Sequence, residues 1–185
     1  MLTMSEIKLG TVISINDQPY VVTFTQHIKK ARSGATLRTK LKNLITGSTL
    51  EKSFAGGDHV EEADIERKSA TFLYVQEGRF YFMDTENFEQ YEFAADAIGD
   101  YRGYLTEGLG ITVLLYNGNA VSIELPKKIT LKVVSAPPGV RGDTSGNVTK
   151  TVTLETGLEV RAPLFIKDGD SIRVNTDSGE YVERA

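Results

Sequence analysis

The sequence contains no cysteine among its 185 residues. The chain therefore has no disulfide framework, no thiolate metal site and no cysteine nucleophile, which fits a reducing compartment. It also has no apolar run long enough to cross a membrane, and its first ten residues, MLTMSEIKLG, lack the apolar core of a signal peptide. We therefore expect a cytoplasmic protein with no membrane partner.

Residues suited to catalysis are scarce as well. The two histidines, His27 and His59, are isolated and lack metal-ligand spacing. The sequence GDTSG at residues 142–146 lacks the G-x-S-x-G spacing of a hydrolase and the lysine of a P-loop. We therefore expect no enzyme activity, no cofactor and no metal. Five further acids are better explained as a solvated face than as an acid–base pair: Glu61, Glu62, Asp84, Glu86 and Glu89.

Charge is distributed unevenly, although the formal net charge is only −4. Residues 1–52 contain eight Lys or Arg against three acids, residues 53–127 five against fourteen, and residues 128–185 eight of each. A uniformly basic chain would bind nucleic acid indiscriminately, whereas this chain would attract phosphate at one end and repel it in the middle. The pattern favours docking on a nucleic acid in one orientation.

The most distinctive stretch is basic, and no acid lies between Asp17 and Glu51. In residues 37–42 cations alternate with leucine and threonine, which predicts a strand with two different faces. The preceding run, YVVTFTQHI, is rich in β-branched and aromatic residues and also predicts a strand. Because Ser33-Gly34 supplies turn residues between them, we predict a hairpin with Arg32 at its tip. The other cations available to an RNA backbone are Lys29, Lys30, Arg38, Lys40 and Lys42.

A purely structural explanation competes with RNA binding. Cations on a strand protect sheet edges from pairing with other sheets, which would account for Lys40 and Lys42. It does not account for the absence of acids over more than thirty residues. The last third has only two aromatic residues, Phe165 and Tyr181, so stacking of many unpaired bases is disfavoured. Backbone and shape contacts with folded RNA are the better hypothesis.

Short runs with strand propensity, separated by turns, extend along the whole chain. Asn16-Asp17, Glu77-Gly78 and Asn117-Gly118 are predicted hairpin turns. The one segment with helical character, residues 92–105, is kept short by its two glycines, and residues 59–66 are expected to be an acidic linker. We predict an all-β protein of three small β-barrel domains in a row: an SH3-like domain over residues 1–64 and OB-type domains over 65–127 and 128–185.

Several motifs resemble those of bacterial translation elongation factor P: KLKNL at 40–44, RGDTSG at 141–146, KTVTLETGLEVRAPLF at 150–165 and SGEYVER at 178–184. The likeness covers essentially the whole chain, with matching element order. It implies a KOW-type first domain followed by two OB-type domains. It also implies a factor that binds the 70S ribosome between the P and E sites, positions the P-site peptidyl-tRNA and relieves stalling at consecutive prolines.

The resemblance also implies roles for individual residues. Arg32 falls at the hairpin tip that reaches the tRNA acceptor end and that a modifying enzyme alters in many members, β-lysine being added to lysine and rhamnose to arginine. The loop Gly142-Asp143-Thr144 matches the segment near the E-site codon and the small subunit, and Tyr181 and Arg184 match end residues implicated in RNA contact. An elongation factor P-like paralogue and a general RNA-binding module stand as alternatives.

Overall fold

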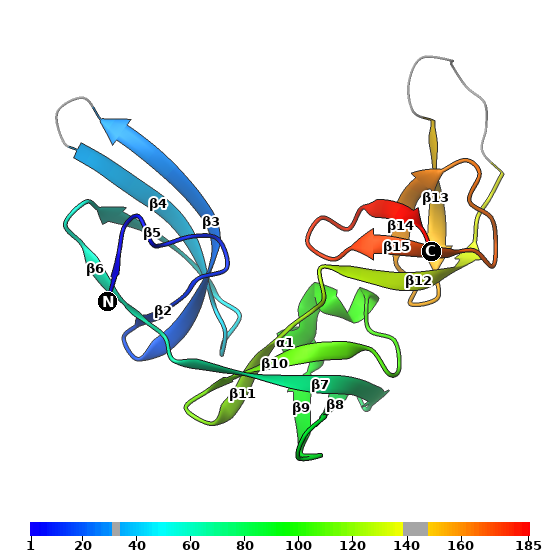
Figure 1. The fold of residues 1–185 in the computed structure, drawn as a ribbon, viewed down its shortest axis with the longest axis horizontal. Coiled ribbons are helices and arrows are strands. Elements are labelled where there is room, and N and C mark those ends of the chain that lie inside the picture. The colour runs from blue at the N-terminus through cyan, green and yellow to red at the C-terminus, as the bar shows by residue number, and fades with distance from the viewer. Residues whose placement is uncertain (31–33, 139–147) are drawn as a thin grey trace. The chain divides into compact units, whose positions relative to one another are not determined.

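The computed structural model describes residues 1–30, 34–138 and 148–185, and only the backbone of residues 29, 30 and 34. Strands predominate in these residues, which confirms the all-β prediction, and the helical segments are a single short turn each, α1 (Ala95–Ile98) and η1 (Gly99–Gly103) (Figure 1). The strands are β1 (Leu2–Thr3), β2 (Val12–Ile15), β3 (Gln18–Lys30), β4 (Gly34–Asn43), β5 (Thr49–Ala55), β6 (His59–Glu62), β7 (Ile65–Gln76), β8 (Arg79–Asp84), β9 (Gln90–Ala94), β10 (Gly110–Tyr116), β11 (Asn119–Glu124), β12 (Lys128–Ser135), β13 (Thr149–Leu154), β14 (Glu159–Pro163), β15 (Ser171–Asn175) and β16 (Tyr181–Arg184).

The first sheet has the strand order β1-β6-β2-β3-β4-β5 and is built on the long hairpin of β3 and β4. Residues 59–62, expected to be linker, form β6 and pair with β1 and β2, so that prediction was wrong. Its acids are exposed and only Val60 faces inward, which leaves little apolar pattern to reveal a strand. The buried core of this sheet consists of Ile7, Ile13, Val22, Leu37, Leu41, Phe54 and Val60.

Two further sheets follow, with the orders β11-β10-β7-β8-β9 and β14-β13-β12-β15-β16. In the second sheet Phe82 packs against Phe72 and Phe93, with ring centroids 5.3 and 5.7 Å apart. In the third, alternate residues of β12 and β15 point inward. Aromatic rings therefore pack inside the second sheet, and mostly branched aliphatic side chains form the core of the third.

The predicted two-residue turns are confirmed. Both central residues have positive φ at Asn16-Asp17 (50° and 58°), at Glu77-Gly78 (50° and 76°) and at Asn117-Gly118 (49° and 77°). Such angles at both positions define the type I′ turn, whose twist matches that of the flanking strands.

The chain divides into two compact units, residues 1–68 with 112–123 and residues 69–111 with 124–185. In the first, the Tyr116 hydroxyl donates to the Asp17 carbonyl at 3.3 Å. In the second, Tyr104 lies in the core of the third sheet, and the Thr156 hydroxyl donates to the Gly103 carbonyl at 2.6 Å. The three-domain boundaries predicted from the sequence stay a prediction.

Candidate nucleic-acid interface

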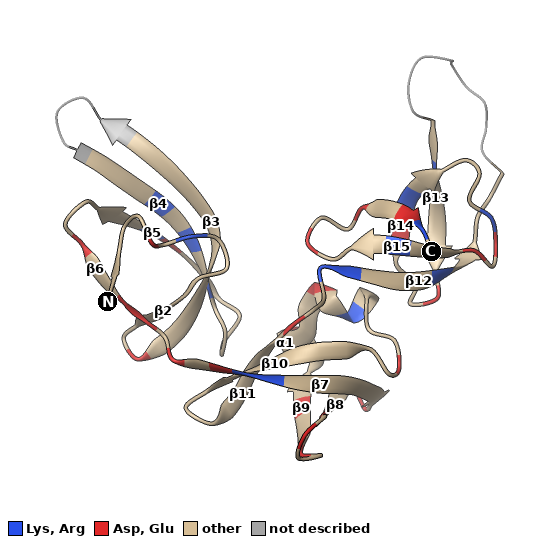
Figure 2. Cartoon of the chain, viewed as in Figure 1, with Lys and Arg blue, Asp and Glu red and all other residues tan. Residues whose placement is uncertain are grey.

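Strand β4 separates its apolar and basic residues by face. Leu37, Thr39 and Leu41 are buried, whereas Arg38, Lys40 and Lys42 are exposed, as the alternation predicted. Figure 2 shows the basic residues along this strand. The backbones of Lys29 and Lys30 extend the same hairpin, where they pair with Ala35 and Gly34. The predicted basic face therefore exists on β4.

An irregularity in β3 adds an aromatic ring to this face. Val22 lies opposite buried Leu41, but the register then shifts, so that Phe24 lies opposite exposed Lys40. Strict alternation would put Phe24 on the same side as Val22, and the extra residue, Thr23, reverses that. Phe24 is consequently 41% exposed, with the Lys40 ammonium 6.0 Å from its ring centroid.

Strand β5 contributes an acid at the same place. Glu51 is directly opposite Lys40 in the register, and one of its carboxylate oxygens lies 3.6 Å from the Lys40 ammonium. Its other oxygen accepts a hydrogen bond of 2.6 Å from Arg38. The hydrogen bond and the positive charge of Arg38 hold the pKa of Glu51 below its usual value, so this carboxylate is ionised at neutral pH.

Neither Phe24 nor Glu51 was predicted from the sequence to be part of the site. For Glu51 a signal existed, since it is the acid that ends the long acid-free stretch. For Phe24 none existed, because a bulge arises from pairing with another strand.

The remaining predicted site residues divide into two groups. Arg32 and the loop Gly142-Asp143-Thr144 lie outside the described residues. At the end of the chain, Tyr181 is half-buried against the core of the third sheet. Arg184 is exposed, with its guanidinium carbon 6.0 Å from the Phe165 ring centroid.

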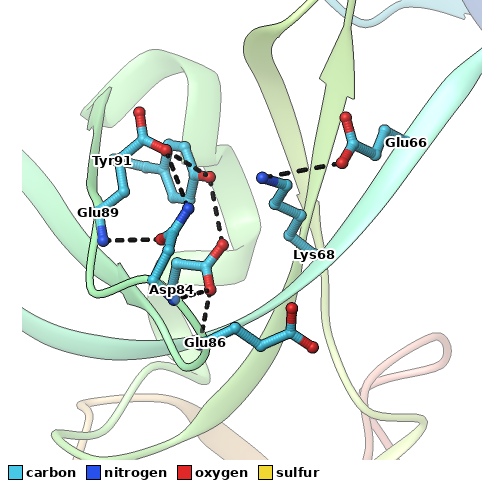
Figure 3. A network of polar contacts seen from close by, with 7 residues as sticks. Glu66, Lys68, Asp84, Glu86, Glu89 and Tyr91 are labelled. Atoms are coloured by element: carbon cyan, nitrogen blue, oxygen red, sulfur yellow. Dashed lines mark hydrogen bonds and ion pairs between the residues drawn. The ribbon is translucent and has the colours of Figure 1, made fainter.

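Asp84 corrects one prediction from the sequence. It was expected on a solvated face with Glu86 and Glu89, which are exposed, but Asp84 itself is buried. Its Oδ1 accepts hydrogen bonds from the backbone N–H groups of Glu86 at 2.7 Å and Asn87 at 3.2 Å (Figure 3). The Tyr91 hydroxyl donates to its other oxygen at 3.4 Å. A buried carboxylate needs such donors, so Asp84 closes a turn.

In residues 1–30, 34–138 and 148–185 there is no group of three or more His, Cys, Asp or Glu side chains that could hold a metal ion. No helix in this part of the chain is long and apolar enough to span a membrane.

Three known protein-family domains match the chain, in the order of its three sheets. Residues 3–60 match the elongation factor P (EF-P) KOW-like domain, residues 65–123 the elongation factor P (EF-P) OB domain, and residues 129–184 the elongation factor P C-terminal domain. The chain belongs to the elongation factor P family. It is accordingly a translation elongation factor, and this family consists of translation factors rather than classical enzymes.

Individual relatives agree with that assignment. The chain is 41% identical to elongation factor P of Moorella thermoacetica and 42% identical to elongation factor P of Dictyoglomus thermophilum, in each case over 185 residues and the full length of both chains. Among solved structures it is similar to a eukaryotic translation initiation factor 5A from Methanococcus jannaschii, with a TM-score of 0.50 and 18% identity over 67% of this chain and 93% of that one. This last likeness concerns the fold alone.

Proposed function

We propose that this elongation factor binds the 70S ribosome between the P and E sites, beside the P-site peptidyl-tRNA, and stimulates peptide-bond formation at consecutive prolines. The outward row of Arg38, Lys40 and Lys42 on β4 carries the proposal. Three cations spaced two residues apart on a regular strand offer contacts to successive phosphates of a folded RNA. The acidic middle of the chain would be repelled by the same RNA, which favours one orientation.

In this proposal the ribosome supplies the chemistry and the factor supplies orientation. Holding the acceptor end of the peptidyl-tRNA in a productive position lowers the entropic cost of reaching the transition state. Arg32 would lie at the acceptor end, and a modifying enzyme that adds a sugar to it would extend its reach. Gly142, Asp143 and Thr144 would contact the E-site codon, with Tyr181 and Arg184 near RNA. These contacts would be made in the cytoplasm by three domains, which span residues 1–64, 65–127 and 128–185.

The test replaces two cations of the exposed row. Lys40→Glu with Lys42→Glu should weaken binding to ribosomes carrying peptidyl-tRNA. The slope of log affinity against log salt concentration should become shallower by the contribution of roughly two phosphate contacts. The double variant should also abolish rescue of a polyproline reporter in a purified translation system. The melting temperature should change little, because both side chains are exposed.

Lys52→Glu is the control for charge reversal at another exposed lysine of the same sheet. Lys52 is exposed on the neighbouring strand but lies opposite buried Thr39, on the other face of the sheet. It should leave the salt slope unchanged. An unchanged slope in the Lys40/Lys42 variant would mean that these lysines make no phosphate contacts. Equal binding of the wild type to free RNA and to loaded ribosomes would instead favour a general RNA-binding module.

A further inference from the structure

Glu51 stands out because it is the only acid in residues 18–57, and it lies against two of the proposed RNA-binding cations. Its two carboxylate oxygens are divided between them, one on Arg38 at 2.6 Å and one on Lys40 at 3.6 Å. The arrangement follows from strand register, because Glu51 is directly opposite Lys40, and Arg38 lies two residues along β4 on the same face.

Lys40 is held from two sides. The carboxylate of Glu51 lies on β5, and the ring of Phe24, turned outward by the bulge in β3, lies on the opposite neighbouring strand. The ammonium is 6.0 Å from that ring centroid, at the outer limit of a cation–π contact. Phe24, Lys40, Arg38 and Glu51 thus form one cluster across three strands, which we call the Glu51 cluster.

The Glu51 cluster contributes little to folding. The Arg38 and Glu51 side chains are 49% and 47% exposed, and ion pairs that open to water are nearly balanced by hydration and side-chain entropy. Their main effect is on the charge that the face presents. A phosphate approaching Arg38 and Lys40 meets a carboxylate that already occupies the donors it would use.

We propose that Glu51 is a selectivity residue, whose carboxylate competes with RNA phosphates for Arg38 and Lys40. An isolated stretch of RNA must displace Glu51 and gains little, because one anion replaces another. An RNA that also engages Lys42 gains a further contact on the same face, and with it enough to displace Glu51. This inference rests on the proposed function. It adds that the Glu51 carboxylate weakens the binding of bulk RNA to the basic face and so favours the correct partner.

The experiment compares Glu51→Gln with wild type on two probes, free total tRNA in solution and 70S ribosomes loaded with peptidyl-tRNA. Glu51→Gln should bind free tRNA about two- to fivefold more tightly, the range in which exposed ion pairs act. The logarithm of its affinity should fall more steeply with the logarithm of salt concentration, by the slope of roughly one phosphate contact. The reason is that Arg38 and Lys40, no longer neutralised by Glu51, can neutralise one more phosphate. The affinity ratio of loaded ribosomes to free tRNA should fall.

Glu92→Gln is the matched control, since Glu92 forms a similar exposed ion pair with Arg79 in the second sheet. It makes the same change in net charge and should alter neither affinity nor salt slope. An equal gain in Glu92→Gln would overturn the proposal, because net charge alone would explain it. No gain in Glu51→Gln would overturn it as well.

A second comparison locates the effect. In an Arg38→Gln background, Glu51→Gln should produce less than half of its gain, because the principal donor is absent. A full gain there would also overturn the competition. The proposed function fails separately: if wild type shows no salt-dependent binding to loaded ribosomes, that proposal is wrong whatever Glu51→Gln does to free tRNA.

Discussion

Tyr91 and Asp84 illustrate how a buried polar pair is tolerated in a small barrel. Tyr91 is 7% exposed, and its hydroxyl lies 3.4 Å from the Asp84 carboxylate and 3.5 Å from that of Glu89. Burial, followed by the charges of Glu89 and Asp84, raises the pKa of Tyr91 to about 12. Both causes oppose the phenolate, the first through lost hydration and the second through like charge.

A pH dependence follows for this one side chain. Between the ordinary tyrosine pKa of 10.0 and about 12, the unfolded chain loses the Tyr91 proton while the folded chain retains it. Folding stability from this group is complete below pH 10 and declines as pH rises toward 12. Urea unfolding of wild type and Tyr91→Phe from pH 9 to 11.5 measures it. The stability difference between them, about 1 kcal/mol at pH 9, should shrink with pH. A constant difference would contradict the raised pKa.

Among the elements, one turn geometry recurs in all three sheets. The side-chain oxygen of an Asn or Asp accepts hydrogen bonds from the backbone N–H groups two and three residues later. Its carbonyl accepts from the N–H group four residues later, and its own N–H donates to the carbonyl five residues later. The residue four positions after the Asn or Asp has positive φ: Gly47 (73°), Phe88 (60°) or Gly179 (72°). The hydrogen bonds lie within residues 43–48, 84–89 and 175–180. The shared turn is an internal repeat that the sequence does not reveal.

Phe88 departs from this pattern, because the two equivalent turns use glycine. A side chain in the left-handed region costs about 1 kcal/mol or more, and Phe88 is 69% exposed, so it recovers little by packing. Phe88→Gly should therefore raise the melting temperature by about 2–4 °C in calorimetry. Gly47→Ala, the opposite change in the first turn, should lower it by a similar amount. A lower melting temperature for Phe88→Gly would show that the ring stabilises the fold.

At the scale of the whole molecule, the second compact unit joins parts of two predicted domains. Tyr104, which directly follows η1, packs in the same buried core as Leu131 and Val174 of the third sheet. Leu158 would lie 3.4 Å from a Cβ at Gly103, so backbone and side chain are closely packed here. We infer that residues 69–111 and 124–185 unfold as one cooperative body.

Removing the Tyr104 ring tests this. Tyr104→Ala should cost about 3–5 kcal/mol, as large-to-small changes of buried aromatic residues do. Hydrogen exchange followed by mass spectrometry should show faster exchange in residues 69–111 and 124–185 together, and unchanged exchange in 1–60. Tyr74→Ala, at an exposed tyrosine, is the control and should change little. Faster exchange confined to one of the two segments would show that they unfold independently.

The sequence by itself determined features that depend on near neighbours. Alternation at residues 37–42 predicted which side of β4 is basic, and Asn117-Gly118 predicted its turn. Both depend on residues a few positions apart, where backbone geometry is decided by local sterics. The motifs at residues 40–44, 141–146, 150–165 and 178–184 likewise indicated the elongation factor P family from the amino-acid sequence, and the family comparison confirms it.

Only the tertiary structure decided what depends on pairing between distant strands. The register of β3 on β4 turns Phe24 outward, and that of β5 on β4 brings Glu51 to Arg38 and Lys40. Residues 59–62 become a strand because β1 and β2 offer a partner, and Asp84 is buried because its turn supplies the donors it needs. Each depends on hydrogen bonds and packing between segments that local propensity does not encode.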